Sequence, residues 1–136
     1  MTCVILAAGY ATRMYPLTRD MPKSLLEVAG KTILDYILEN LGRAPEIRRL
    51  ILVSNARFFG SFSAWAKNRT FPFPLHILDD GSTDNDNRLG AVADLAFAVE
   101  EAEIRENLLV LAGDNLFDFE IRDFIAFFQT RKADCI

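Results

Sequence analysis

Cations cluster directly behind the first apolar run of the chain. Gly9 follows the run at residues 3–8, and Arg13, Arg19 and Lys23 come after it. A guanidinium presents a planar fork to phosphate oxygens, and an ammonium presents a compact charge. Backbone N–H groups around a glycine can cradle an anion or face a base. These residue types indicate a site for a phosphorylated ligand, although a solvated loop whose cations balance nearby carboxylates would account for them equally well.

A carboxylate stands at the end of another apolar run. Asp114 follows residues 107–113, and a carboxylate at that position faces the same crevice as the first loop if the two strands are parallel neighbours. Taken alone, an aspartate after a strand is more often a turn or cap residue. Asp114 is a candidate site residue only in combination with the cations of the first loop.

A polar, carboxylate-rich loop at 80–88 offers base-reading groups. The amides of Asn85 and Asn87 each present a donor and an acceptor, so either side chain can read a base edge. Gly90 lets a flat ring lie close to the backbone. A solvated loop with a helix cap explains each asparagine nearly as well. Asp79 and Asp80 are interpreted as the end of a strand rather than as metal ligands.

Strand-length apolar runs alternate with helical patterns along the whole chain. Continuous apolarity favours strands that are covered on both faces, as in a parallel sheet. The alternation predicts an α/β fold with a doubly wound, mostly parallel, Rossmann-like sheet. The expected strands are 3–8, 49–55, 74–80 and 107–114, and the expected helices are 32–42, 58–68, 88–102 and 120–132.

Apolar spacing predicts which helix faces are buried. Thr32 and Asp35 form a capping-box pattern for the first helix, Gly42 can end it, and Asp118 is the expected cap of the last helix. His76 and Trp65 are interpreted as packed side chains. The expected core positions of the last two helices are Leu89, Val92, Ala96 and Val99, and Ile121, Phe124, Ile125 and Phe128.

Composition limits the possible partners. The 136 residues carry a net charge of −4, which argues against a general nucleic-acid binder. The apolar runs are far shorter than the ~20 residues of a membrane span, and no signal-peptide pattern precedes the first run. Cys3 and Cys135 are interpreted as buried small hydrophobes in a reducing compartment. We therefore expect a cytoplasmic protein. The chain shows neither a P-loop nor a G-x-G-x-x-G motif.

The stretch LAAGYATRMYPLTRDMPKSLLEVAGKTILDYIL, residues 6–38, resembles the N-terminal signature of the sugar-phosphate nucleotidylyltransferases, or NDP-sugar pyrophosphorylases. The gap between Arg13 and Lys23 also resembles this family more than the related guanylyl- and cytidylyltransferases. Two positions depart from the pattern. Ala11 stands where a second glycine is usual, so a slightly altered loop path is expected, and Thr32 stands where proline is common.

The resemblance implies a GT-A-like nucleotidyltransferase fold and transfer of a nucleotidyl group from a nucleoside triphosphate to a sugar 1-phosphate, with release of pyrophosphate. It implies that Arg13 holds the leaving pyrophosphate, that Lys23 bridges the α-phosphate and the incoming sugar phosphate, and that Asp114 binds Mg²⁺. The nucleotide-binding positions that we expect are Leu6, Ala8, Gly9, Asn85 and Gly90.

Two other interpretations stay open. The chain could be a non-catalytic nucleotide-binding or regulatory module, or an unrelated α/β protein that binds another phosphorylated ligand. Residues 133–136 resemble the start of a fifth strand, so we expect residues 1–136 to form one domain that is the N-terminal part of a longer, truncated one. The expected partners are the two substrates and further copies of the chain, without nucleic acid or membrane.

Overall fold

The structure, a computed structural model, describes residues 1–67, 69–131 and 134–135. Its centre is a sheet of four parallel strands in the order β5-β4-β1-β6. Val4 lies opposite Ile51 on one side and Val110 on the other, which sets the register. The strands are β1 (Thr2–Leu6), β4 (Arg49–Ser54), β5 (Leu75–Asp79) and β6 (Leu108–Ala112). The predicted α/β fold with a parallel sheet is confirmed.

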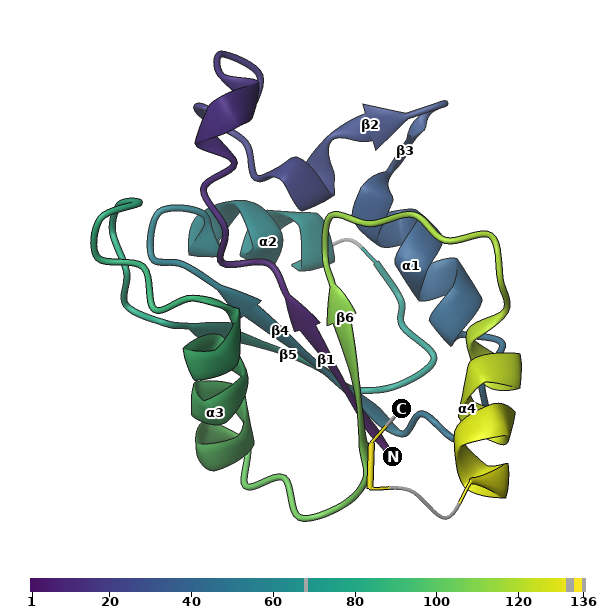
Figure 1. The fold of residues 1–136 in the computed structure, drawn as a ribbon. Coiled ribbons are helices and arrows are strands. Elements are labelled where there is room, and N and C mark those ends of the chain that lie inside the picture. Colours follow the sequence, from purple (N-terminus) through teal and green to yellow (C-terminus); the bar gives the residue numbers. More distant parts are fainter. Residues whose placement is uncertain (68, 132–133, 136) are drawn as a thin grey trace.

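The strand order contains a reversal. From β1 the chain moves outward to β4 and β5, and then returns to place β6 on the other side of β1 (Figure 1). In open parallel sheets, ligands bind beyond the carboxyl ends of the strands at such a reversal. The gap between the loops that follow β1 and β6 is therefore the expected binding place.

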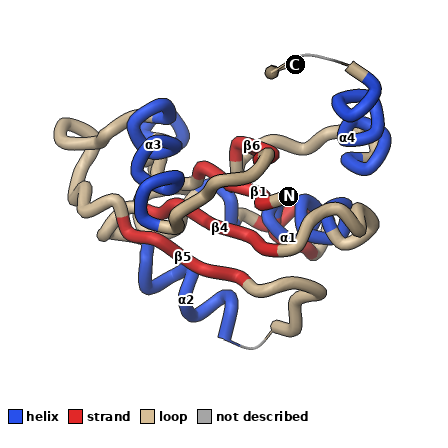
Figure 2. Tube along the Cα trace, turned by 90° about the horizontal axis from the view of Figure 1, so that it is seen from below, coloured by secondary structure: helices blue, strands red, loops and turns tan. Residues whose placement is uncertain are grey.

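Helices cover both faces of the sheet. Figure 2 shows α3 on one face, with α1 and α2 on the other. The larger core cluster joins Ile5 and Leu52 to α1, α2 and α4, and the smaller one joins Val4 and Ile51 to Ala98 of α3. The helices are α1 (Ile33–Leu41), α2 (Phe59–Lys67), α3 (Ala91–Glu101) and α4 (Ile121–Thr130).

The central and outer strands differ in burial. Most of β1 and β4 is buried, as continuous apolarity predicts, but Val110 of β6 is 38 % exposed. His76 is exposed, so its predicted packing is wrong. The physical reason is that β5 and β6 are edge strands, each with a neighbour on one side only. Trp65 is buried in the larger cluster, as expected.

Local signals define α1 well. Thr32 accepts a hydrogen bond from the Asp35 N–H, and the Asp35 carboxylate accepts one from the Thr32 N–H, so the predicted capping box is confirmed. Gly42 is the C-cap. Short elements that the sequence pattern did not predict surround the start of this helix. They are the 3₁₀ turns η1 (Thr12–Met14) and η2 (Lys23–Leu25) and the hairpin strands β2 (Glu27–Val28) and β3 (Lys31–Thr32).

The buried face of α3 differs from the prediction. Leu89 and Val92 are exposed, the latter by 85 %, whereas Asp94 and Ala98 are the buried residues of the helix. The register of the helix on the sheet is a packing outcome, and it turns the first-turn valine toward solvent. Ala96 is likewise exposed, and Val99 packs against the smaller cluster.

The C-terminal region corrects further expectations. In α4, Ile121 and Ile125 are buried as predicted, but Phe124 is 37 % exposed. Glu120 rather than Asp118 is the N-cap. Cys3 is buried, and Cys135 is exposed.

Parts of three predicted elements lie outside the described residues. They are residue 68 of the second helix, residue 132 of the last helix, and residues 133 and 136 of the expected fifth strand. Of that strand, the described residues 134 and 135 are not in strand conformation. No helix in the described part of the chain is long and apolar enough to cross a membrane.

Candidate functional site

A pocket of about 460 Å³ lies at the carboxyl end of the sheet, at the reversal between β1 and β6. This volume is typical of small-molecule sites. Its lining combines the loop after β1, the start of η2, the segment that enters α3, and the end of β6. The lining residues are Leu6, Ala7, Ala8, Gly9, Ala11, Lys23, Ser24, Arg88, Gly90, Ala91, Asp94, Ala112 and Asp114.

A buried asparagine holds the loop after β1 in place. The Asn55 amide donates to the Ala8 carbonyl at 2.8 Å and accepts from the Phe58 N–H at 2.9 Å. Asn55 is fully buried at the end of β4, so its hydrogen bonds are shielded from water. Asn55 therefore positions the Ala8–Gly9 backbone on the pocket wall. The sequence pattern did not predict a role for Asn55, and its one signal was a polar residue at the end of an apolar run.

The loop then turns through Ala11. This residue has φ 45° and ψ 41°, in the left-handed region, and the Thr18 hydroxyl donates to its carbonyl at 2.8 Å. The alanine thus adopts the conformation that a glycine takes more easily. Arg13 follows on η1, with an exposed side chain that does not line the pocket.

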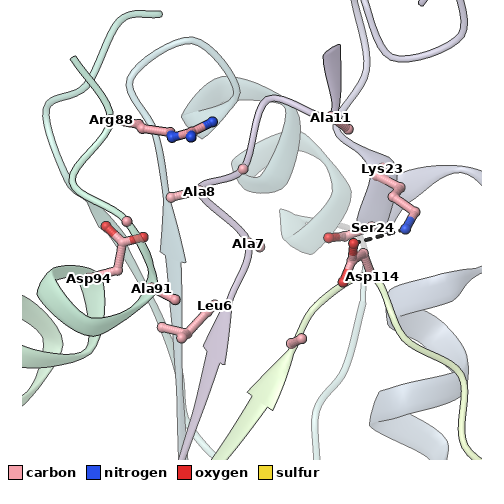
Figure 3. A pocket seen from close by; sticks show the side chains of 13 residues that line it. Leu6, Ala7, Ala8, Ala11, Lys23, Ser24, Arg88, Ala91, Asp94 and Asp114 are labelled. Atoms are coloured by element: carbon pink, nitrogen blue, oxygen red, sulfur yellow. Dashed lines mark hydrogen bonds and ion pairs between the residues drawn. The ribbon is translucent and has the colours of Figure 1, made fainter. Parts of the chain in front are cut away.

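Lys23 and Asp114 meet at the β6 side of the pocket. The Lys23 ammonium donates to the Asp114 carboxylate at 2.9 Å, although the two residues are far apart in the sequence (Figure 3). Gly113 makes this approach possible: a Cβ there would lie 3.0 Å from Ser24 Oγ and 3.1 Å from Ala7 Cβ. The structure therefore joins two of the predicted residues in one cluster.

The opposite wall is formed by the segment that enters α3. Gly90 is the N-cap of α3, with φ 90°. Arg88 lies on the same side of the pocket and donates to Asn85 Oδ1 at 2.5 Å. Asn85 itself does not line the pocket, so it supports Arg88 instead of facing a ligand. Asn87 is engaged within its own loop, where its side-chain oxygen accepts from the Thr83 and Asp84 N–H groups.

Asp94 is an unexpected member of the pocket wall. It is 6 % exposed, and burial, together with a hydrogen bond and the charge of Asp80, raises its pKa to about 6. Asp80 is held by the N–H and hydroxyl of Ser82, both at 2.7 Å from Asp80 Oδ1. The expectation that Asp80 simply ends a strand was too narrow, since its carboxyl also faces Asp94.

The pocket offers one carboxylate suited to a hard metal ion. Mg²⁺ is commonly held by one or two carboxylates, with phosphate oxygens and water completing the shell. Asp114 fits that donor set, because its side chain is 43 % exposed beside the pocket. Within residues 1–67, 69–131 and 134–135, His, Cys, Asp and Glu form no metal-binding group of three or more. The residues present therefore suit a metal that arrives with a phosphorylated ligand.

Comparisons with known proteins identify the family of the chain. The family model for nucleotidyl transferases matches residues 2–136. The bifunctional protein GlmU of Methanococcus vannielii is 29 % identical over 125 residues, which are 92 % of this chain and 27 % of that protein. The N-acetylmuramate alpha-1-phosphate uridylyltransferase of Caulobacter vibrioides is 58 % identical over 38 residues, or 28 % of this chain and 16 % of that protein.

Solved structures share the fold. A UDP-glucose pyrophosphorylase in complex with UDP-glucose superposes with a TM-score of 0.73 at 16 % identity, over 95 % of this chain and 53 % of the other. The chain thus spans about a quarter of GlmU and about half of this structural neighbour. Because the family model covers nearly the whole sequence, the chain belongs to the nucleotidyl transferase family, among relatives that are sugar-phosphate nucleotidyltransferases.

Proposed function

We propose that this chain forms the nucleotide-binding part of an enzyme that makes an NDP-sugar and pyrophosphate from a nucleoside triphosphate and a sugar 1-phosphate. The observation that carries the proposal is the meeting of Lys23 and Asp114 at 2.9 Å, beside the Ala8–Gly9 backbone. An ammonium, a carboxylate and exposed N–H groups at one sheet edge suit a triphosphate with its metal ion.

The reaction needs positioning and charge neutralisation more than protein nucleophiles. A sugar 1-phosphate oxygen attacks the α-phosphorus, the bond from that phosphorus to the bridging oxygen breaks, and pyrophosphate leaves with the bonding electrons. Both reactants are anions, so fixed positive charge lowers the barrier by stabilising the crowded transition state. Lys23 is the residue that we assign to the oxygens of the α-phosphate and of the incoming phosphate.

Lys23 can exchange its present partner. The Lys23 and Asp114 side chains are 31 % and 43 % exposed, and ion pairs at such positions contribute about 1 kcal/mol or less. We assign Asp114 to Mg²⁺, which neutralises phosphate charge when it is bound. If Mg²⁺ engaged its carboxylate, Asp114 would no longer hold the Lys23 ammonium, which could then contact the phosphates.

We keep Arg13 as the proposed contact for pyrophosphate. It lies on η1, beyond the carboxyl end of β1, and its exposed side chain can turn toward a ligand. We assign nucleotide contacts to Leu6, Ala8, Gly9 and Gly90, which all line the pocket, and an indirect role to Asn85 through Arg88.

A non-catalytic nucleotide-binding module is the second candidate. The chain spans 27 % of the matched GlmU and 53 % of the matched pyrophosphorylase structure. Such a module would bind a triphosphate with Mg²⁺ and would not turn it over.

Two measurements separate these functions. Calorimetry tests binding of each nucleoside triphosphate with and without Mg²⁺, and a pyrophosphate-release assay tests each triphosphate against a panel of sugar 1-phosphates. The assay is run on this chain and on any longer gene product that contains it. Binding without turnover in both proteins would favour the module.

Variants test the assigned roles. Lys23→Ala and Asp114→Ala should each lower turnover by roughly 10²–10³, the loss typical of one electrostatic stabiliser. Lys31→Ala is the matched control, because Lys31 pairs with Glu39 on the surface and lies outside the pocket lining. Full activity in either pocket variant would contradict the role assigned to that residue.

A further inference from the structure

One buried serine on the pocket wall has no partner within the protein. Ser24 is 3 % exposed and lines the pocket beside Lys23 and Asp114. Its hydroxyl makes no hydrogen bond with any residue in the described part of the chain. Buried polar side chains nearly always have a hydrogen-bond partner, so this hydroxyl calls for an explanation.

The oxygen of this hydroxyl is open to the pocket. Within residues 1–67, 69–131 and 134–135, the side-chain atoms that are both enclosed and unpartnered belong to Glu46, Asp80 and Asp94, so Ser24 Oγ is not an enclosed atom. Figure 3 shows the Ser24 side chain beside the Asp114 carboxylate, with its oxygen pointing into the pocket. The hydroxyl can therefore reach a molecule that occupies the pocket.

The backbone holds Ser24 in this position. It is the middle residue of η2, where the Leu25 N–H donates to the Pro22 carbonyl at 2.9 Å. The Leu25 side chain packs in the larger core cluster. A Cβ at Gly113 would lie 3.0 Å from Ser24 Oγ, so the end of β6 closes the space on that side. The hydroxyl is thus preorganised, and the pocket is its open side.

Packing does not require a hydroxyl at this position. The strand ends around it contribute Ala7, Ala8 and Ala112 to the pocket lining, and their methyl groups present no hydrogen-bonding atom. An alanine in place of Ser24 would fit among them and would bury no polar atom. The serine adds one O–H donor and its acceptor lone pairs to an otherwise apolar strip.

We propose that the Ser24 hydroxyl donates a hydrogen bond to an oxygen of the α-phosphate, which makes Ser24 a further substrate-binding residue beside Lys23. The inference rests on the proposed function, which assigns the α-phosphate to Lys23. Phosphate oxygens are charged acceptors, and hydrogen bonds to charged groups are shorter and stronger than neutral ones. The hydroxyl complements the ammonium, because it fixes the direction of one oxygen whereas the ammonium acts as a point charge.

Calorimetry on the full chain tests the contact with Ser24→Ala. With Mg²⁺ present, the variant should bind every nucleoside triphosphate that the wild type binds roughly 10- to 100-fold more weakly, the range for one hydrogen bond to a charged group. The loss should not depend on the base, because the base takes no part in the contact. The matching nucleoside monophosphate keeps only the α-phosphate and should show the same loss.

Urea denaturation without ligand separates this role from a structural one. Because the Ser24 hydroxyl has no partner within the folded protein, Ser24→Ala should unfold at the wild-type urea midpoint or slightly above it. Ser63→Ala is the matched control, since Ser63 is half-buried in α2 and lies outside the lining of this pocket. That substitution should leave every affinity unchanged.

The outcomes are distinct. If the wild type binds no triphosphate, the proposed function is contradicted. If it binds one and Ser24→Ala binds it equally well, a nucleotide site remains and only the assignment of Ser24 is overturned. A loss confined to the triphosphate, with the monophosphate unaffected, would contradict the contact with the α-phosphate. Weaker binding accompanied by a lower urea midpoint would show a structural role in place of the contact.

Discussion

Contacts with residues far apart in the sequence determine the charge and hydrogen bonding of single side chains in and around this pocket. The Lys23 ammonium donates a hydrogen bond to Asp114 at the end of a distant strand. The Asn55 amide donates one to the loop after β1. Asp94 stands in the first turn of α3, where a helix dipole favours negative charge, yet burial and Asp80 oppose its ionisation. The net effect is a raised pKa, so Asp94 stays protonated at a higher pH than an ordinary aspartate.

The pKa of Asp94 predicts a pH dependence of stability. Its value rises from 3.8 to about 6 on folding, chiefly through burial, so the stabilisation is present below pH ~4 and is lost as pH rises through ~6. Asp94→Asn imitates the neutral acid. Its free energy of unfolding in urea should match the wild type near pH 3.5 and exceed it by roughly 1–3 kcal/mol at pH 8.

The same titration in Asp86→Asn should follow the wild type at both pH values, because Asp86 is exposed. A wild-type protein that is no less stable at pH 8 than Asp94→Asn would show that the Asp80–Asp94 contact carries no strain.

The pocket is formed where several helices and strands begin or end. The carboxyl ends of β1 and β6 and the first turn of α3 surround the pocket, and η2 brings Lys23 to it. These elements pack tightly at Gly113, where the N–H donates to the Leu6 carbonyl at 2.9 Å and an added Cβ would lie 3.0 Å from Ser24 Oγ. This glycine sets the spacing between η2 and the end of β6.

Gly113→Ala should therefore disturb the site and the fold together. A new Cβ would lie 3.0–3.1 Å from Ser24, Ala7 and Ile5, so the wall must shift, at a cost of about 1–3 kcal/mol in unfolding free energy. Displacement of Lys23 from Asp114 should also weaken binding of a triphosphate with Mg²⁺. Urea denaturation and calorimetry measure the two effects.

Gly60→Ala provides the matched control. Gly60 lies in α2, and a Cβ added there would have open space around it. The substitution should therefore leave binding unchanged and stabilise the helix by roughly 0.5–1 kcal/mol. Equal behaviour of the two variants would mean that η2 and β6 are not tightly coupled.

The molecule as a whole is an asymmetric layered sheet. Three helices contribute to the core on one face and α3 covers the other, while the β6 edge keeps Val110 partly exposed. An open edge strand can pair with another chain. Homo-oligomer formation stays a prediction, and so do the limits of the domain at residues 1–136.

Ligand linkage provides a test at the scale of the whole chain. A ligand that binds only the folded state stabilises it by RT ln(1 + [L]/Kd), or about 2.7 kcal/mol at a concentration of 100 Kd. A nucleoside triphosphate with Mg²⁺ should then raise the melting temperature by roughly 10 °C. Scanning calorimetry measures this shift, with a sugar 1-phosphate alone as the comparison ligand. Equal protection by the sugar phosphate alone would argue against a nucleotide site.

Local patterns in the sequence were sufficient for much of this protein. The strand and helix alternation predicted the parallel sheet, and Thr32 and Asp35 predicted the start of α1, because hydrogen bonds between near neighbours form these features. The signature at residues 6–38 indicated the family that the family model then matched. Burial of both faces was predicted correctly for the central strands, where every side chain has neighbours.

Only the tertiary structure decided which side chains line the pocket. Apolar spacing placed Val92 in the core, whereas the packed helix buries Asp94, and Arg88 rather than Arg13 lines the pocket wall. The rotation of a helix on a sheet and the path of a loop depend on contacts between residues far apart in the chain. Those contacts, such as Asn55 with Ala8, have no local sequence period to reveal them.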